Sequence, residues 1–174
     1  DYGPAKDIMV FLLGPATVAL AVPLYKNRHT LLRNAFPASL GLVVGSLTTL
    51  LAAVVLARLF GLSQVIRASI SVKSVTAPIA IELASILHGD SSLTAAFVIA
   101  TGMIGAMLGP WLMDVVGIHV PLARGLALGT ISHGQGAAQA VIEGEMQGAA
   151  AGIAMGLAAV FTSLIAPILV PAIL

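Results

Sequence analysis

Long apolar stretches separated by short polar breaks run along nearly the whole chain. Residues 37–60, 93–116 and 148–174 are each long enough to cross a bilayer, because a membrane helix needs about 20 predominantly apolar residues. Residues 8–24 form a shorter apolar stretch that is just long enough to span and is punctuated by glycine and proline. The pattern therefore predicts transmembrane helices at these four places.

Two further apolar segments, residues 63–88 and 122–143, are interrupted by polar residues near their centres. The first carries Lys73 among serines and threonines, and the second carries the run GTISHGQG at residues 129–136. Both compositions make poor continuous helix, and irregular backbone inside a bilayer is tolerated only where protein buries it or where it lines a cavity. The predicted fold class is an all-α polytopic membrane protein with about five to seven membrane segments, two of them interrupted or re-entrant.

The two interrupted segments occupy matching places in a candidate internal repeat with units 37–88 and 93–143. In each unit a glycine-containing span is followed by an arginine, Arg67 or Arg124, then by a polar cluster and an alanine-rich stretch. Chance similarity between apolar segments is the alternative to duplication. Paired interrupted segments in corresponding halves are the best sequence pointer to a transporter binding site. We expect residues 1–174 to form a single membrane domain.

The composition supports a membrane protein and excludes several other classes. Hydrophobic residues make up 59% of the chain and charged residues 9%, and mean hydropathy is +1.06, which is too apolar for a soluble domain. The net charge of +1 argues against nucleic-acid binding. Cysteine is absent, the four histidines lack a metal-ligand spacing, and the sequence has no phosphate-binding loop or paired catalytic carboxylates. We therefore expect no enzyme activity, no metal and no cofactor.

Charged residues away from the polar centres of segments 63–88 and 122–143 indicate which parts of the chain face the cytoplasm or the protein surface. Residues 26–33 form a polar loop with three basic residues and no acidic one, so the positive-inside rule predicts a cytoplasmic loop. Arg67 and Arg124 lie near the starts of their segments, where contact with lipid phosphate explains them as well as attraction of a substrate does. Glu143 is expected on the surface, beside a short polar turn at residues 144–147.

Lys73 is the most informative residue, because a lysine at the centre of a membrane helix costs roughly 2.5–3.5 kcal/mol on insertion scales. Ser74 and Thr76 add hydroxyl donors, and Pro78 is expected to free a backbone carbonyl one turn earlier. Together these groups suit a small carboxylate or a travelling proton. The alternatives are a lysine that snorkels to the interface, or one that pairs with Glu82 for structural reasons.

The second cluster has the residue types of an anion site with a titratable group. An unwound stretch exposes backbone N–H groups, and a half-helix that starts at Gln135 presents its positive end to an anion. Thr130 and Ser132 are hydrogen-bond donors, and His133 can carry a proton near neutral pH. The alternative is close helix packing, with these side chains forming interhelical hydrogen bonds.

Three sequence blocks, in order, resemble those of a known family. They are LGPATVALAVPLYK at residues 13–26, KSVTAPIA at 73–80 and GLALGTISH at 125–133. The chain is therefore similar to the LrgB/CidB family of bacterial inner-membrane proteins, whose relatives include the plastid glycolate/glycerate translocator. Family members usually carry further N-terminal helices, so we expect part of the N-terminal sequence to be missing here. Residues 134–139 depart from the family's usual Ala-x-Gly-Thr, and any role of that threonine is not carried over.

The resemblance implies a multi-pass protein of the bacterial inner membrane with one of two functions. One is secondary, proton-coupled transport of small monocarboxylates of the pyruvate or glycolate class, with effects on autolysis and a small membrane partner of the LrgA/CidA type. The other is a holin- or antiholin-like regulator of murein hydrolase export. The residues favour transport, because a lesion-forming protein needs no lysine and histidine beside two broken helices. A purely structural scaffold, the third class, predicts no cost from changing Lys73.

The transport hypothesis predicts one substrate site where the two interrupted segments meet near the midplane. Lys73 is its electrostatic anchor and His133 its proton-coupling group. A homodimer is expected as well, because Gly41 and Gly45 form a small-residue face that suits close helix contact. The predicted substrate-binding residues are Lys73, Ser74, Thr76, Pro78, Thr130, Ser132, His133 and Gln135.

Overall fold

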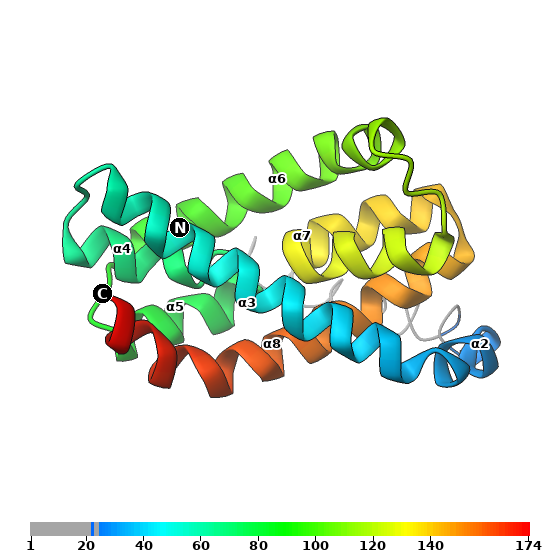
Figure 1. Ribbon diagram of the computed structural model, residues 1–174, viewed down its shortest axis with the longest axis horizontal. Helices are drawn as coiled ribbons and strands as arrows, with labels where there is room; N and C mark the ends of the chain where they lie inside the picture. The colour runs from blue at the N-terminus through cyan, green and yellow to red at the C-terminus, as the bar shows by residue number, and fades with distance from the viewer. Residues whose placement is uncertain (1–21, 23–24) are drawn as a thin grey trace, which may run out of the picture.

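The computed structural model describes residue 22 and residues 25–174, and this part of the chain contains helices and no strands. Figure 1 shows that α3, α6 and α8 run most of the length of the molecule, whereas α4 and α5 occupy one half of it and α7 the other. The predicted all-α membrane fold class is confirmed. Almost all of the predicted span at residues 8–24 lies outside the described residues. The helices are α2 (Arg28–Arg33), α3 (Ala35–Leu59), α4 (Gln64–Ser71), α5 (Ala77–Ile86), α6 (Ser91–Val115), α7 (Pro121–Glu143) and α8 (Glu145–Ile173).

Three helices of the described part, α3, α6 and α8, are long and apolar enough to cross a membrane. They contain 25, 25 and 29 residues, and at about 1.5 Å per residue each exceeds the roughly 30 Å of a bilayer core. Their ends fall within three residues of the predicted spans. Large apolar side chains are exposed on their outward faces, as contact with lipid requires: Leu40, Val44, Leu51, Ile104, Met107, Trp111, Leu157, Val160 and Leu164.

Residues 63–88 form a hairpin of two short helices rather than one crossing. Ser63 caps α4, its side chain accepting the N–H of Ile66, and α5 begins at Ala77 with a proline in its first turn. With 8 and 10 residues, the two helices are about 12 and 15 Å long, or roughly half of a bilayer core each. The chain then returns beside α4, because Ser69 Oγ accepts the N–H of Asp90 at 2.8 Å.

Helix α7 also turns back on itself. His133 has φ 42° and ψ −127°, which breaks the helix into halves at residues 121–132 and 134–143. Arg124 and Glu143 would lie about 28 Å apart on a straight helix, yet Arg124 Nε is 2.7 Å from Glu143 Oε2. The segment is therefore re-entrant. In Figure 1 its two halves lie side by side near one end of the molecule.

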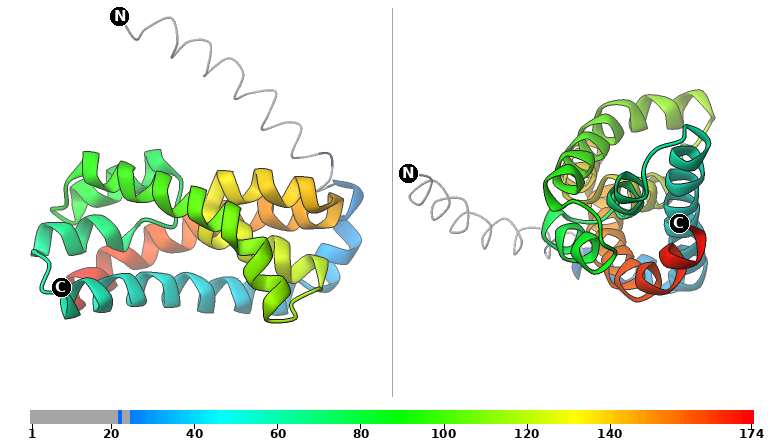
Figure 2. Two further views of the ribbon diagram at one scale, coloured as in Figure 1. Left: turned by 90° about the horizontal axis from the view of Figure 1, so that it is seen from above. Right: turned by 90° about the vertical axis from the view of Figure 1, so that its left-hand side faces the viewer.

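The two hairpins enter the molecule from opposite ends. Figure 1 and the left panel of Figure 2, in which the long axis is horizontal, place α4 and α5 at the end where α3 finishes and α7 at the end where α6 finishes. The helix α6 begins 56 residues after α3 begins (91 against 35). Positive-φ glycines follow the two long helices at Gly61 and Gly117, again 56 positions apart. This correspondence supports an inverted repeat of one span and one hairpin, and the repeat units themselves stay a prediction.

Close packing of α7 on α8 depends on small residues. A Cβ added at Gly125 or Gly129 would collide with the backbone carbonyl of Gln147 or Ala151. The facing residues of α8, Ala150 among them, are fully buried. The backbones of the two helices therefore approach each other as small-residue interfaces in membranes allow, which fixes the second hairpin to a spanning helix.

Two predictions about polar connections are wrong. Residues 26–33 are not a loop: residues Arg28–Arg33 form α2, whose last turn leads through Asn34 into α3. The polar turn expected at 144–147 is reduced to Gly144, because α8 begins at Glu145. In both cases few residues separate two helices, so the polar side chains sit on helix ends instead of a separate loop.

Candidate functional site

The ends of the two hairpins meet at a small cavity in the interior. Its volume is about 10 Å³, close to the least space that holds one water molecule. Six of the eight residues around it carry hydroxyl groups, and they come from α3, the first hairpin, α7 and α8. The lining residues are Ser46, Thr49, Leu50, Ser71, Val72, Ser74, Thr130 and Thr162.

Not all of these hydroxyl groups have partners within the protein. Thr49 Oγ1 donates within α3 to the carbonyl oxygens of Gly45 and Ser46, at 3.0 Å each, and Ser71 Oγ donates to Ala68 O at 2.7 Å. Ser46 Oγ is buried and has no hydrogen-bond partner among the described residues. The cavity thus keeps hydrogen-bonding capacity that the protein itself does not use.

Lys73 lies between the cavity-lining residues Val72 and Ser74, in the irregular stretch between α4 and α5. Its side chain is half-buried, and Nζ donates to Ser74 Oγ at 3.3 Å. Glu82, the alternative structural partner, is exposed, and no ion pair involving Lys73 is found in the described part of the chain. The lysine charge is therefore partly desolvated without a carboxylate beside it.

The polar residues at the turn of α7 divide between two surroundings. Thr130 faces the cavity, whereas Ser132, His133 and Gln135 pack against the middle of α6. His133 Nε2 lies 3.1 Å from Val98 O. A Cβ at Gly102 of α6 would collide with Gln135 Oε1, a buried oxygen that lacks a hydrogen-bond partner among the described residues. Glycine on α6 is thus what allows the turn of α7 to approach so closely.

Thr76 and Pro78 lie away from the cavity. Thr76 is the N-cap residue of α5 and lines a separate groove of about 410 Å³ between α5 and α8. Pro78 is exposed and lies in the first turn of α5, where a backbone N–H has no helical partner to lose. The expectation that Pro78 frees a carbonyl is therefore wrong, since this proline starts a helix instead of interrupting one.

The electrostatics of the two breaks favour an anion. The helix α5 and the second half of α7 both begin at the breaks, so the N-termini of two half-helices, with their partial positive charge, lie near the hairpin ends. Lys73 adds a full positive charge, while the described residues that line the cavity include no acidic one. Hydroxyl donors, a cation and two helix N-termini together suit a small carboxylate.

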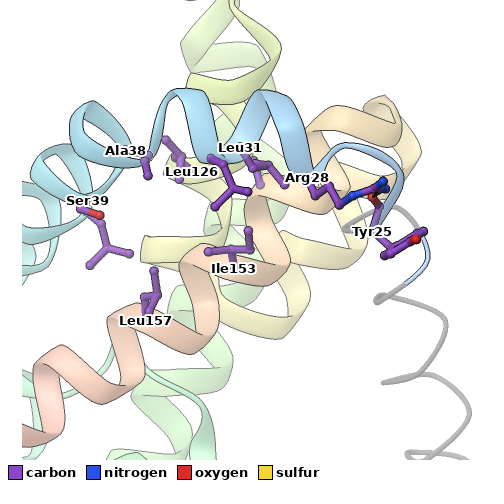
Figure 3. Close-up of a pocket in the computed structure, with 12 residues that line it drawn as sticks. Tyr25, Arg28, Leu31, Ala38, Ser39, Leu126, Ile153 and Leu157 are labelled. Carbon is purple, nitrogen blue, oxygen red and sulfur yellow. Dashed lines mark hydrogen bonds between the residues drawn. The ribbon is translucent and has the colours of Figure 1, made fainter.

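Grooves approach the hairpin ends from two directions. One of about 410 Å³ runs between α3 and α7 and includes Thr130, so this residue separates the groove from the cavity. The groove lined by Thr76 approaches from the side of α8. A larger apolar groove of about 540 Å³ lies near α2, between Arg28 and Leu157 (Figure 3), and it adjoins the groove at Thr130 through Ala38 and Leu126.

Four hydroxyl-bearing cavity residues were missed by sequence reasoning, namely Ser46, Thr49, Ser71 and Thr162. Ser71 ends the short helix α4, and the other three lie within helices that are apolar enough to span, where a single hydroxyl group commonly serves helix packing. The signal was the run Gly45-Ser46-Leu47-Thr48-Thr49 in an otherwise aliphatic segment.

Arg124 and Glu143 were also misjudged. Arg124 is buried and Glu143 partly buried, and the two form a bidentate ion pair with Nε–Oε2 and Nη2–Oε1 distances of 2.7 and 2.9 Å. Arg124 Nη1 additionally contacts Asp114 Oδ1 at 2.5 Å and Ile118 O at 3.0 Å. The guanidinium group of Arg124 is therefore engaged by protein groups, and Glu143 is partly buried beside it instead of lying on the surface. The cluster joins the two ends of α7 to the end of α6.

Comparison with known proteins agrees with this architecture at the level of family. The model of the LrgB-like family matches residues 1–172. The chain is 39% identical to the Bacillus subtilis protein YxaC over 78% of the chain and 59% of that protein. It is 34% identical to the antiholin-like protein LrgB of B. subtilis, and 31% identical to that of Bacillus cereus (strain B4264), in each case over 99% of the chain and 75% of the relative.

The chain spans about three fifths of two of these relatives, 59% of YxaC and 62% of YwbG from B. subtilis. No solved structure matches it. The match to the family model covers nearly the entire sequence and includes both interrupted segments. The chain belongs to the LrgB-like family.

Proposed function

We propose that this chain forms the substrate-binding part of a secondary carrier for small monocarboxylates of the pyruvate or glycolate class, in the bacterial inner membrane. The supporting observation is the hydroxyl-lined cavity between two opposed hairpins, with Lys73 beside it and no paired acid. Membrane proteins place ionisable groups in the bilayer interior at substrate or ion pathways, because an unneeded charge there is costly. A purely structural role does not explain a half-buried lysine without an acidic partner or the unpartnered hydroxyl group of Ser46.

In this proposal each group at the hairpin ends has a distinct part. Lys73 attracts the carboxylate, and Ser74 and Thr130 donate hydrogen bonds to its oxygens from opposite hairpins. The N-termini of α5 and of the second half of α7 add partial positive charge. A carboxylate bridging the two hairpins would replace the protein–protein contacts that now close the space between them.

The size of the cavity indicates an occluded arrangement. A volume of about 10 Å³ holds no more than one water molecule, so a monocarboxylate requires the hairpin ends to separate. The groove at Thr130 and the groove at Thr76 provide two directions of opening. Alternate opening of these grooves is the rocking of one repeat against the other that secondary carriers use.

His133 is the proposed proton-coupling residue. Its imidazole is buried against α6, with Nε2 3.1 Å from Val98 O. Binding of an anion at Lys73 would offset the positive charge of the lysine and favour a protonated imidazole nearby. Substrate and proton would then bind together, which is the requirement for symport.

An antiholin-like regulatory function is the second candidate, and the names of the LrgB relatives support it more directly than they support transport. The exposed apolar faces of α3, α6 and α8 would accommodate a second copy or a small membrane partner of the LrgA/CidA type. Regulation of autolysis is compatible with transport if it follows from carboxylate flux. The two candidates differ in whether regulation depends on Lys73.

Uptake of labelled carboxylates by proteoliposomes containing the full-length protein tests the proposal. Wild type should take up pyruvate or glycolate, and Lys73→Ala should lower uptake at least about tenfold, since a charge-assisted hydrogen bond is worth roughly 1.5–3 kcal/mol. Lys73→Arg should restore part of it. Lys26→Ala is the control, because Lys26 forms an exposed pair with Glu145. Absence of uptake by wild type, together with autolysis regulation that survives Lys73→Ala, would favour the antiholin-like function.

A further inference from the structure

We infer that Ser46 on α3 donates a hydrogen bond directly to the bound anion, so that a spanning helix completes the site formed by the two hairpins. The inference rests on the proposed function and adds a residue to it. Its starting point is that Ser46 is 7% exposed and that its Oγ has no hydrogen-bond partner among the described residues. An unpartnered buried hydroxyl group is unfavourable unless a ligand or water supplies the missing partner.

The position of Ser46 places this hydroxyl group opposite the hairpin ends. Ser46 shares the cavity with Ser74 of the first hairpin and Thr130 of α7. The neighbouring residue Gly45 faces α7, since a Cβ there would make ordinary van der Waals contact with Thr130 Cγ2 at 3.6 Å. Three hydroxyl groups from three different elements therefore surround one point, which a two-oxygen carboxylate can satisfy together with Lys73.

The local backbone holds Ser46 in place. Thr49 Oγ1 donates to the carbonyl oxygens of both Gly45 and Ser46, at 3.0 Å each. The hydroxyl group of Thr49 is thus committed to the helix, while that of Ser46 is free to act on a ligand. Between them, Thr48 is exposed on the outer face of the same helix turn and provides a matched control.

The experiment compares Ser46→Ala with Thr48→Ala in the full-length protein, by pyruvate and glycolate uptake in proteoliposomes and by thermal unfolding in detergent. Ser46→Ala should raise the KM about tenfold or more, as expected for a hydrogen bond to a charged group. Its unfolding temperature should be unchanged or higher, because the substitution removes an unsatisfied polar group. Thr48→Ala should behave as wild type in both measurements.

Two further results distinguish a failure of the inference about Ser46 from a failure of the proposed carrier function. If wild type transports and Ser46→Ala has an unchanged KM, Ser46 serves only a bound water or helix packing, and this inference is overturned while the carrier function stands. If wild type transports no carboxylate, the proposed function fails and the inference fails with it. Ser46→Cys, which keeps the side-chain size but donates weakly, should have an intermediate KM; a KM equal to that of wild type would also count against Ser46.

Discussion

At the scale of single residues, six of the nine buried polar side chains in the described part of the chain line the cavity or form the turn of α7. Ser74 and Thr130 line one cavity, and Lys73 donates to Ser74 Oγ; that these residues bind a substrate stays a prediction. His133 adopts a backbone conformation with φ 42°, which non-glycine residues adopt rarely and mostly where the surrounding structure enforces it. The strained turn brings the imidazole against α6.

His133→Ala tests the coupling role at this scale. Uptake by wild type should vary between about pH 5 and 8, the range in which histidine ordinarily titrates, and the variant should lose most of that variation while still binding substrate. The measurement is initial uptake rate against external pH. His119→Ala, in the exposed turn before α7, is the control. A pH profile that is unchanged in His133→Ala would remove His133 from the mechanism.

At the scale of helices, the sequence predicted the three long spans well because each is a continuous apolar run. It located both interruptions correctly, at Lys73 and at His133, because serine, threonine and glycine weaken helix. It left open whether these segments cross or re-enter, since this depends on contacts between residues distant in sequence. The contact between Arg124 and Glu143 answers the question for α7, and no local pattern encodes it.

The same contact makes a prediction about stability. Glu143→Gln should lower the unfolding temperature in detergent, since it removes the charge that faces two nitrogens of Arg124. Asp114 remains on Nη1, so the cost should lie below the roughly 3–5 kcal/mol of a buried charge that loses its only partner. Replacement of both Arg124 and Glu143 by methionine should cost less than Glu143→Gln alone. Glu145→Gln is the matched control, because Glu145 pairs with Lys26 on the surface and exposed pairs contribute about 0–1 kcal/mol. Equal effects of Glu143→Gln and Glu145→Gln would contradict a role for the cluster in holding the second hairpin.

At the scale of the whole molecule, the two hairpins entering from opposite ends form the architecture that carries the proposed function. The sequence indicated a repeat through its paired interruptions and through the glycines that follow α3 and α6. The sequence did not indicate that α3 lines part of the cavity, because Ser46 resembles an ordinary packing residue of a spanning helix. The cavity residues that the sequence did not single out have ordinary residue types for their helices, and only their place in the folded protein brings them to the cavity.

Membrane orientation follows from the same arrangement. Positive charge near α2 predicts that this end is cytoplasmic, which puts the start of α6 on the outer side. Asn27→Cys should react with an impermeant thiol reagent only after cells are opened, whereas Ser92→Cys, exposed at the start of α6, should react in intact cells. The opposite pattern would invert the orientation without changing the fold.

The most direct test of the central claim, that a small carboxylate binds between the hairpin ends, is substrate protection of a cysteine placed in the cavity. Thr130→Cys in full-length protein that still transports should react slowly with a small thiol reagent, and saturating pyruvate or glycolate should slow the reaction severalfold. Ser39→Cys, in the apolar groove near α2, should react at the same rate with and without substrate. An unchanged rate at Thr130→Cys in the presence of a transported carboxylate would contradict a binding site at this position.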